Sequence, residues 1–224
     1  MDNTKHIKQL HFGVSFNTMF KILDIWGEIA DDILYKNKYF SPEFFTNIST
    51  QYTTERVLFN PEMGHRLLLT SNNLVFTQTI LDNYDSEYAI FKKRIVNYLV
   101  PNILSSHGLV VRRLGMVFIT ELDERTIERF GAKYFNPAIH GIHDFRFSRK
   151  EVSKSGLILT GNSDFVNKIF SVGNLGVGLD GISYDFQLHF SPLREDVRDS
   201  IEKFLNVANQ DFSADVLEGL GKKK

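Results

Sequence analysis

The sequence predicts an α+β fold in which antiparallel sheets are each covered by helices. A helical pattern at 86–105 leads through a short turn directly into an apolar strand at 109–120. The stretch 182–190 alternates strictly between apolar and polar residues, as expected of a strand with one solvent-facing side. Runs of strand pattern followed by helix pattern, rather than a regular strand–helix alternation, favour α+β over a parallel α/β fold.

The first half of the chain carries most of the helical patterns. A strand is predicted at 7–14 and a helix at about 18–35, with apolar residues at helical spacing. A meander of strands at 51–59, 65–70 and 74–81 follows, with turns at 60–64 and 71–73. In the helix at 86–105, Pro101 predicts a kink or an early end near Leu99. Asp123 is a candidate N-cap of a helix that reaches about Phe135.

The second half is predicted to consist mostly of strands. These are expected at 145–152, 156–161, 165–173 and 181–190. Ser191 and Pro192 form a serine cap followed by proline at the first helical position, which predicts that the last helix begins there. The glycine-rich stretch 173–181 precedes a strand rather than a helix, so it favours a hairpin tip over a phosphate-binding loop.

The stretch 136–144 contains proline, glycine and two histidines and is the best candidate boundary. We therefore expect an N-terminal α+β half at 1–136 and a C-terminal half at 145–224, with one continuous domain as the alternative. The two halves could be related sandwiches, although no sequence repeat is strong enough to establish a duplication.

Composition excludes several classes of function. The chain of 224 residues has no cysteine, which rules out disulfides, thiolate metal ligands and a cysteine nucleophile. The formal net charge of −1 does not favour general nucleic-acid binding. The absence of a signal-peptide pattern at the N-terminus and of a long apolar run predicts a cytoplasmic protein without a membrane segment. We expect no cofactor and no metal site.

Four polar residues are candidate ligand-binding groups. Arg112 and Arg113 lie in the middle of a strand, where alternation places them on opposite faces, so one of them should meet the covered face or an interface. A buried arginine needs a carboxylate partner, whereas an exposed one can bind an anion or phosphate. Asp185 and His189 share the exposed face of the last strand with Gln187 between them, about 13 Å apart by the strand rise and too far to touch.

Two further clusters of side chains are candidate sites. His140, His143 and Asp144 are residue types that bind zinc or iron, but no matching further ligands are evident, so a polar loop is the default expectation. An aromatic cluster follows the first helix and is either a protein interface or part of the core. Its members are Tyr35, Tyr39, Phe40, Phe44, Phe45 and Tyr52.

Four segments together carry a resemblance to a known family. They are the meander around 67–76, the helix around Tyr88 and Phe91, the strand Val111-Arg112-Arg113-Leu114-Gly115-Met116-Val117-Phe118-Ile119 and the ending Ala208-Asn209-Gln210-Asp211-Phe212. On these residues the chain resembles a sporadically distributed prokaryotic family of uncharacterised α+β proteins. Family members typically show Arg-Leu-Gly-aliphatic-Arg-Tyr-Ile-Asn in that strand. This chain departs from the pattern at 116–118 and at Thr120. The resemblance supports the fold and implies no activity.

Three function classes follow. The leading hypothesis is a non-catalytic binding protein that self-associates or serves as a subunit of a larger prokaryotic assembly. The second is an enzyme or sensor acting on a phosphorylated or nucleotide ligand, which requires Arg112 or Arg113, Asp185 and His189 to converge on one pocket. The third is a nucleic-acid-associated subunit of a mobile-element or defence system, which requires a contiguous basic surface.

Overall fold

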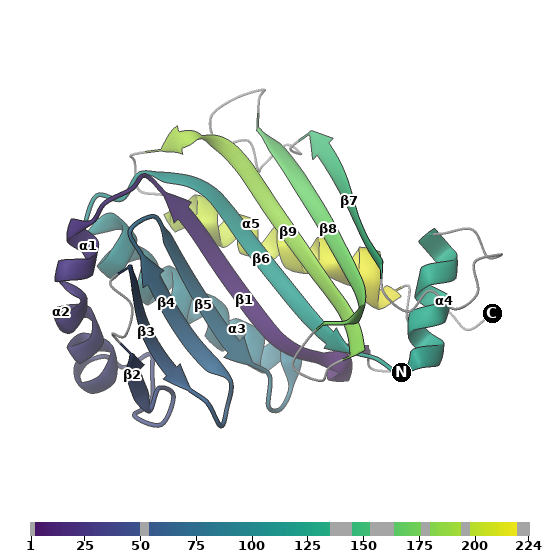
Figure 1. The fold of residues 1–224 in the computed structure, drawn as a ribbon, viewed down its shortest axis with the longest axis horizontal. Helices are drawn as coiled ribbons and strands as arrows, with labels where there is room; N and C mark the ends of the chain where they lie inside the picture. Colours follow the sequence, from purple (N-terminus) through teal and green to yellow (C-terminus); the bar gives the residue numbers. More distant parts are fainter. Residues whose placement is uncertain are drawn as a thin grey trace.

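A single nine-stranded antiparallel sheet forms the centre of the protein (Figure 1). The computed structural model describes residues 3–49, 54–134, 145–152, 164–175, 180–193 and 198–218. The strand order is β2-β3-β4-β5-β1-β6-β9-β8-β7, and the α+β class is confirmed. The strands are β1 (Ile7–Phe16), β2 (Asn47–Ser49), β3 (Glu55–Asn60), β4 (His65–Thr70), β5 (Asn73–Thr79), β6 (Val111–Glu121), β7 (Phe145–Val152), β8 (Phe165–Asn174) and β9 (Asp180–Leu193).

The helices lie around this sheet. In Figure 1 the sheet is in front, with α3 and α5 behind it, while α1 and α2 lie at the end near β2. No helix in the described part of the chain is long and apolar enough to cross a membrane. The helices are α1 (Lys21–Asp24), α2 (Trp26–Asp31), α3 (Tyr84–Arg94), α4 (Glu124–Tyr134) and α5 (Arg198–Phe212), with π-helical segments Asp32–Lys36, Ile95–Ser105 and Ser213–Leu217.

The two predicted halves are joined in one sheet through β1 and β6. These strands pair antiparallel along most of their length, with Gly13 directly opposite Gly115. Each half has the order strand, helix, strands, helix: β1, α1–α2, β2–β5, α3, and then β6, α4, β7–β9, α5. The halves therefore repeat one topology on either side of the β1–β6 pair, although each contributes to a shared sheet rather than forming its own.

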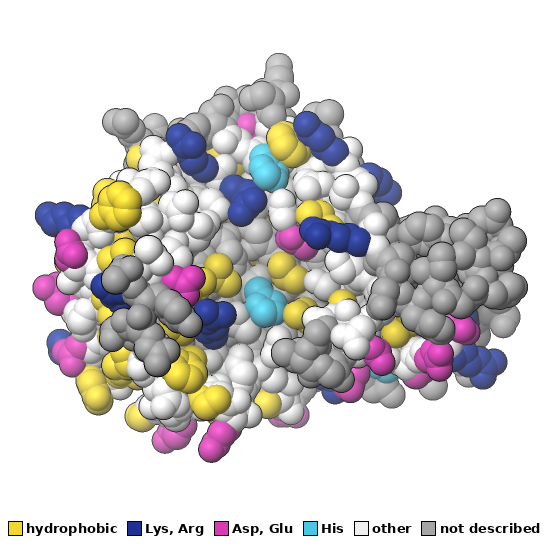
Figure 2. Space-filling view, viewed as in Figure 1, with side chains coloured by type: hydrophobic (Ala, Val, Ile, Leu, Met, Phe, Trp, Pro, Cys, Tyr) yellow, Lys and Arg dark blue, Asp and Glu magenta, His cyan; other side chains and the backbone are white. Residues whose placement is uncertain are grey.

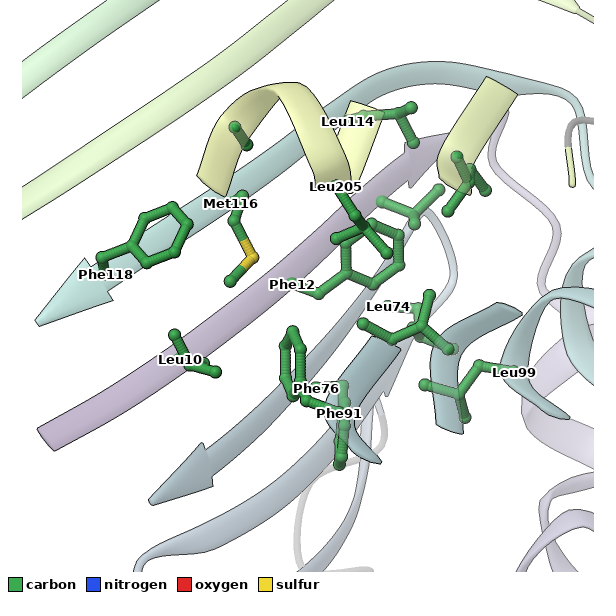
Figure 3. Packing of buried hydrophobic residues seen from close by; sticks show 14 of the residues in the cluster. Leu10, Phe12, Leu74, Phe76, Phe91, Leu99, Leu114, Met116, Phe118 and Leu205 are labelled. Carbon is green, nitrogen blue, oxygen red and sulfur yellow. The ribbon is translucent and has the colours of Figure 1, made fainter. Parts of the chain in front are cut away.

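The core lies between the sheet and the helices α3 and α5. Alternate residues of the central strands, such as Phe12, Phe76 and Phe118, are fully buried on this face. They pack beneath Phe91 of α3 and Leu205 of α5 (Figure 3). Because each large apolar side chain removed from water contributes about 1.5–3 kcal/mol, this layer determines which face of the sheet is covered.

One predicted helix start is wrong, and of the two outcomes predicted at Pro101, a kink or an early end of the helix, the early end is wrong. Pro101 does not end the second helix, because α3 continues as the π-helix Ile95–Ser105, in which seven of the eleven side chains are buried. The wider π turn, held by packing, takes the place of the expected break. Ser191 and Pro192 do not open the last helix either. Leu193 still pairs with Val111, which extends β9, and α5 begins at Arg198.

Candidate ligand site on the open face of the sheet

The site is built on the face of the sheet opposite α3 and α5. Along β1, Leu10, Phe12 and Val14 face the core, so His11 and Gly13 face the other way, as the period of two requires. Figure 2 views this open face, where histidine, basic and acidic side chains gather around its central part. The register across β5, β1, β6 and β9 brings side chains far apart in sequence into neighbouring positions on this face.

A hollow of about 180 Å³ lies over the centre of this face, and we call it the glycine hollow. Its floor contains Gly13 and Gly115, which face each other on the two central strands. Val75 and Gln187 occupy the flanking strands in the same row, since Val75 pairs with Gly13 and Gln187 pairs with Gly115. The remaining lining residues are His11, Val14, Ser15, Asn73, Arg113, Val117 and Asp185.

A second, wider hollow of about 680 Å³ adjoins the first and shares Ser15, Asn73 and Arg113 with it. We call it the arginine hollow, because Arg112 and Arg113 both line it. His189, Asn17 and Asn72 also line it, and its described lining contains no carboxylate side chain. This end of the open face therefore presents two guanidinium groups beside neutral hydrogen-bonding side chains, a combination suited to an anion.

Arg112 and Arg113 do not lie on opposite faces, which corrects the expectation from strand alternation. Both are exposed, and neither enters the core. Ser15 of β1 pairs with Arg113, whereas the next residue, Phe16, pairs with Val111, so Arg112 is an extra residue in β6. A β-bulge interrupts the alternation in this way, and it lets adjacent residues present their side chains to the same side.

Asp185, Gln187 and His189 form one hydrogen-bonded chain along β9. The Gln187 amide donates from Nε2 to Oδ2 of Asp185 at 2.6 Å. His189 Nε2 donates to Oε1 of Gln187 at 3.2 Å, so Gln187 bridges two groups that do not touch. The imidazole of His189 also stacks on Phe165, with ring centroids 4.6 Å apart.

Burial and neighbouring charges set the protonation of Asp185 and His189 in this hydrogen-bonded row. Burial raises the pKa of the Asp185 carboxyl, against the hydrogen bond from Gln187 and the charges of Arg113 and Arg146, which lower it. Burial also lowers the pKa of His189, and the positive charges of Arg113 and Lys150 act in the same direction. At neutral pH His189 is therefore a neutral donor rather than a cation.

His11 is the main polar residue of the site that sequence analysis did not single out. Its Nδ1 lies 2.9 Å from the hydroxyl of Thr77, while its Nε2 is buried without a hydrogen-bond partner among the described residues. Burial, and then the charge of Arg66, lowers the pKa of His11 to about 4. The ring is therefore neutral at pH 7, with one nitrogen free for a further hydrogen bond.

The structure brings together the four candidate residues named from sequence. Arg113 lines both hollows, Asp185 lines the glycine hollow, and Arg112 and His189 line the arginine hollow. His11, Gly13 and Gly115 were missed. A signal existed, because an apolar residue followed by glycine in mid-strand occurs at Phe12-Gly13 and again at Leu114-Gly115.

The aromatic cluster is not the surface patch that the interface hypothesis requires. Phe40, Phe44 and Phe45 are buried in the core, and Phe44 stacks on His65 with ring centroids 3.9 Å apart. Tyr39 packs partly buried against the core, and only Tyr35 is largely exposed, at 80%. Tyr52 lies outside the described residues.

The possible metal ligands His140, His143 and Asp144 also lie outside the described residues. Within the described ranges, no group of three or more histidine, aspartate or glutamate side chains is placed to hold a metal ion.

No protein-family model matches the chain, and no curated protein matches it.

Proposed function

We propose that this protein is a non-catalytic binding protein that receives a small anionic ligand on the open face of its sheet. The observation that carries the proposal is the arginine hollow, where Arg112 and Arg113 stand side by side because of the β-bulge. Arg113 donates to Ser15 at 3.2 Å, and Ser15 in turn donates to Asn73 at 2.7 Å. The guanidinium is thus positioned while it remains exposed to a ligand.

Electrostatics supports an anion at this end of the face. A guanidinium offers a planar set of N–H donors that matches carboxylate and phosphate oxygens. The nearest carboxylate in the lining, that of Asp185, lies in the adjoining glycine hollow and is already bonded to Gln187. An anion beside Arg112 and Arg113 therefore meets positive charge and neutral donors.

Binding without catalysis is favoured over an enzyme by the role of Gln187. Its amide engages both Asp185 and His189, so these groups are tied to each other rather than directed at a substrate. An enzyme or sensor for a phosphorylated or nucleotide ligand is the second candidate, since the same residues line the hollows. Hydrolysis of p-nitrophenyl phosphate that is lost in His189→Gln would favour this candidate.

Anion binding is tested with inorganic phosphate as the probe. Backbone amide shifts of the full chain are followed by NMR as phosphate is added at constant ionic strength. We expect shifts centred on β1, β6 and β9, and an increase in Kd of about tenfold in Arg113→Met, since one charge-assisted contact is worth about 1.5 kcal/mol.

The matched control is Arg129→Met. Arg129 is an exposed arginine on α4, so this variant changes the net charge by the same amount at a distance from the hollows. Equal weakening in both variants would mean that phosphate responds to overall charge, and it would contradict a site at Arg113.

Self-association, or a place in a larger prokaryotic assembly, is a separate proposal. It is supported by two exposed aromatic side chains at the two ends of the helical run 21–36, where Phe20 is 71% and Tyr35 is 80% exposed. Light scattering on the purified chain tests it, and a monomer at all concentrations would count against self-association.

Two expectations from sequence have less support. A nucleic-acid-associated subunit requires a contiguous basic surface, and the face in Figure 2 carries both signs of charge. For location, we propose the cytoplasm, on the absence of cysteine.

A further inference from the structure

The two glycines of the glycine hollow are not required by the fold. Gly13 and Gly115 are both absent from the glycines with positive φ, which are Gly64, Gly108 and Gly173. A Cβ added to Gly13 would meet nothing within 4 Å, and one added to Gly115 would meet only the carbonyl oxygen of Gly13, at 3.9 Å. Neither backbone conformation nor packing therefore excludes alanine at these positions.

Gly181 shows what a structurally required glycine looks like in the same sheet. A Cβ there would lie 1.7 Å from the carbonyl oxygen of Thr120, so the close approach of two strands excludes any side chain. Glycine in mid-strand is otherwise unfavourable, because it is flexible in the unfolded chain and packs nothing. Two facing glycines without such a reason leave bare backbone where a ligand can approach closely.

The recess that they leave has bare backbone as its floor. Its floor is the peptide backbone of two adjacent strands, which lie about 4.8 Å apart. Val75 and Val117 provide apolar walls, and the hollow measures about 180 Å³. A planar ring can lie against bare peptide groups over its whole face, whereas the axial hydrogens of a saturated ring hold it away.

His11 is a second and independent sign of a ligand. It lines the hollow, and its Nε2 is buried without a partner among the described residues. A buried polar atom with no hydrogen bond is costly, and it marks a place where a ligand can supply the partner. Thr77 already engages the other ring nitrogen, so Nε2 is the ring nitrogen whose hydrogen-bonding capacity is unused among the described residues.

We propose that the ligand is an aromatic or heteroaromatic acid. Its planar ring lies on Gly13 and Gly115, a polar ring substituent or ring nitrogen bonds Nε2 of His11, and its anionic group lies beside Arg113. The placement follows from the two adjoining hollows, because Arg113 lines both and connects the flat floor to the cationic end. This inference rests on the proposed anion site and adds the chemical class of the ligand.

The test compares benzoate with cyclohexanecarboxylate, which carry the same charge and similar bulk but differ in planarity. Amide shifts of the full chain are followed by NMR in separate titrations, with inorganic phosphate as a third probe. We expect benzoate to bind about tenfold more tightly than cyclohexanecarboxylate, the scale of a favourable ring-stacking contribution. Equal affinities would overturn the planar-ring proposal.

Alanine variants locate the ring. Gly13→Ala and Gly115→Ala should each weaken benzoate at least about tenfold, since a methyl group raised from the floor removes the flat contact, and should leave phosphate unchanged. The control is Gly27→Ala in α2, where an added Cβ also meets nothing within 4 Å. If the two sheet variants bind benzoate as Gly27→Ala does, the ring does not lie on the glycines.

The outcomes separate this inference from the proposed function. Phosphate binding that depends on Arg113, without any preference for benzoate, would retain the anion site and overturn the aromatic ligand. If neither phosphate nor benzoate perturbs the open face, both proposals fail.

Discussion

Position by position, the strand pair β1–β5 can be matched to the strand pair β6–β9. When Gly13 is set on Gly115, Phe12 corresponds to Leu114 and Phe16 to Phe118. β5 pairs with β1 as β9 pairs with β6, so Phe76, opposite Phe12, corresponds to Leu188, opposite Leu114. Five of these residues are fully buried and Phe16 nearly so, and both halves therefore place apolar side chains on the covered face.

The open face is where the halves differ. His11, opposite Thr77 in one half, corresponds to Arg113, opposite His189 in the other. Asn73, opposite Ser15, corresponds to Asp185, opposite Val117. The core must be filled with apolar volume in both halves, so its positions vary little in character. The open face is free of this requirement, and at this matched position the first half carries a neutral imidazole where the second carries a guanidinium.

One position on the covered face of the sheet does not carry an apolar side chain in both halves. Leu69 of β4 is opposite Leu74, and its counterpart in β8 is Lys168, opposite Phe186. Lys168 is 2% exposed, and its Nζ lies 2.7 Å from Asp211 and 3.1 Å from Asp215. The C-terminal half thus anchors α5 and the following π-helix by a buried ion cluster where the N-terminal half uses leucine.

The largest expected effect on stability comes from replacing Lys168 with leucine, the side chain of its counterpart Leu69. Lys168→Leu should lower the free energy of unfolding by roughly 2–3 kcal/mol, because it leaves two partly buried carboxylates without this cation. Urea denaturation measures the change. A triple variant, Lys168→Leu with Asp211→Leu and Asp215→Asn, should recover most of the loss, since apolar replacements of buried ion groups are often neutral.

If Lys168→Leu alone has the stability of the wild type, the ion cluster does not anchor the helix. The difference between the halves at this position would then make no contribution to the free energy of unfolding.

The next largest expected effect is on the pH dependence of stability, and it concerns His11. Its counterpart in the other half, Arg113, does not change charge in acid. Because the pKa of His11 is lowered to about 4 in the folded protein, the unfolded chain binds more protons between pH 6.5 and 4. Stability should therefore fall as the pH decreases through this window. From pH 7 to 4.5 the wild type should lose roughly 2 kcal/mol more than His11→Gln, after allowing for partial solvent exposure.

Urea denaturation of both proteins at the two pH values measures this difference directly. Contributions from Asp185, His65 and His189 are common to both proteins and cancel in the comparison. Parallel loss of stability in wild type and His11→Gln would show that the imidazole takes up its proton without cost, contrary to its buried position.

The smallest effect is a gain in stability at the two glycines that mark the equivalence of the halves. Gly13→Ala and Gly115→Ala should each raise the free energy of unfolding by about 0.5–1 kcal/mol, because alanine loses less conformational freedom on folding. Thermal or urea unfolding measures it. Gly181→Ala serves as the opposite case and should be strongly destabilising, since its Cβ would collide with Thr120.

A loss of stability in Gly13→Ala or Gly115→Ala would mean that these glycines serve the fold. A gain in stability combined with loss of benzoate binding would instead show that stability is sacrificed there for a site.

Sequence patterns predicted the elements well where one physical requirement dominated. β4 and β7 have the predicted bounds, and β9 has the predicted alternation, because one face of each strand pair must meet the core. The predictions failed where a local signal competed with packing or pairing. Pro101 signals a break, yet buried neighbours keep the π-helix continuous. Ser191 and Pro192 signal a helix start, yet pairing with β6 extends the strand.

The candidate site was only half predictable. Arg113, Asp185 and His189 stand out as polar groups in apolar strands, and alternation along β9 placed Asp185 and His189 on one face. Alternation also separated Arg112 from Arg113, which was wrong, because a bulge depends on the partner strand and leaves no mark in one sequence. The interface hypothesis failed for Phe40, Phe44 and Phe45 because burial depends on what packs above them.

By itself, the sequence determined the class of the fold, the strands and helices with a clear period, and the exclusion of thiol chemistry, because these depend on neighbours along the chain. Only the tertiary structure decided that β1 and β6 pair and unite the two halves in one sheet. That pairing sets His11 and Gly13 beside Gly115 and Arg113, residues about one hundred positions apart, and creates both hollows. Contacts between distant strands follow from the packing of the whole core, which no local pattern encodes.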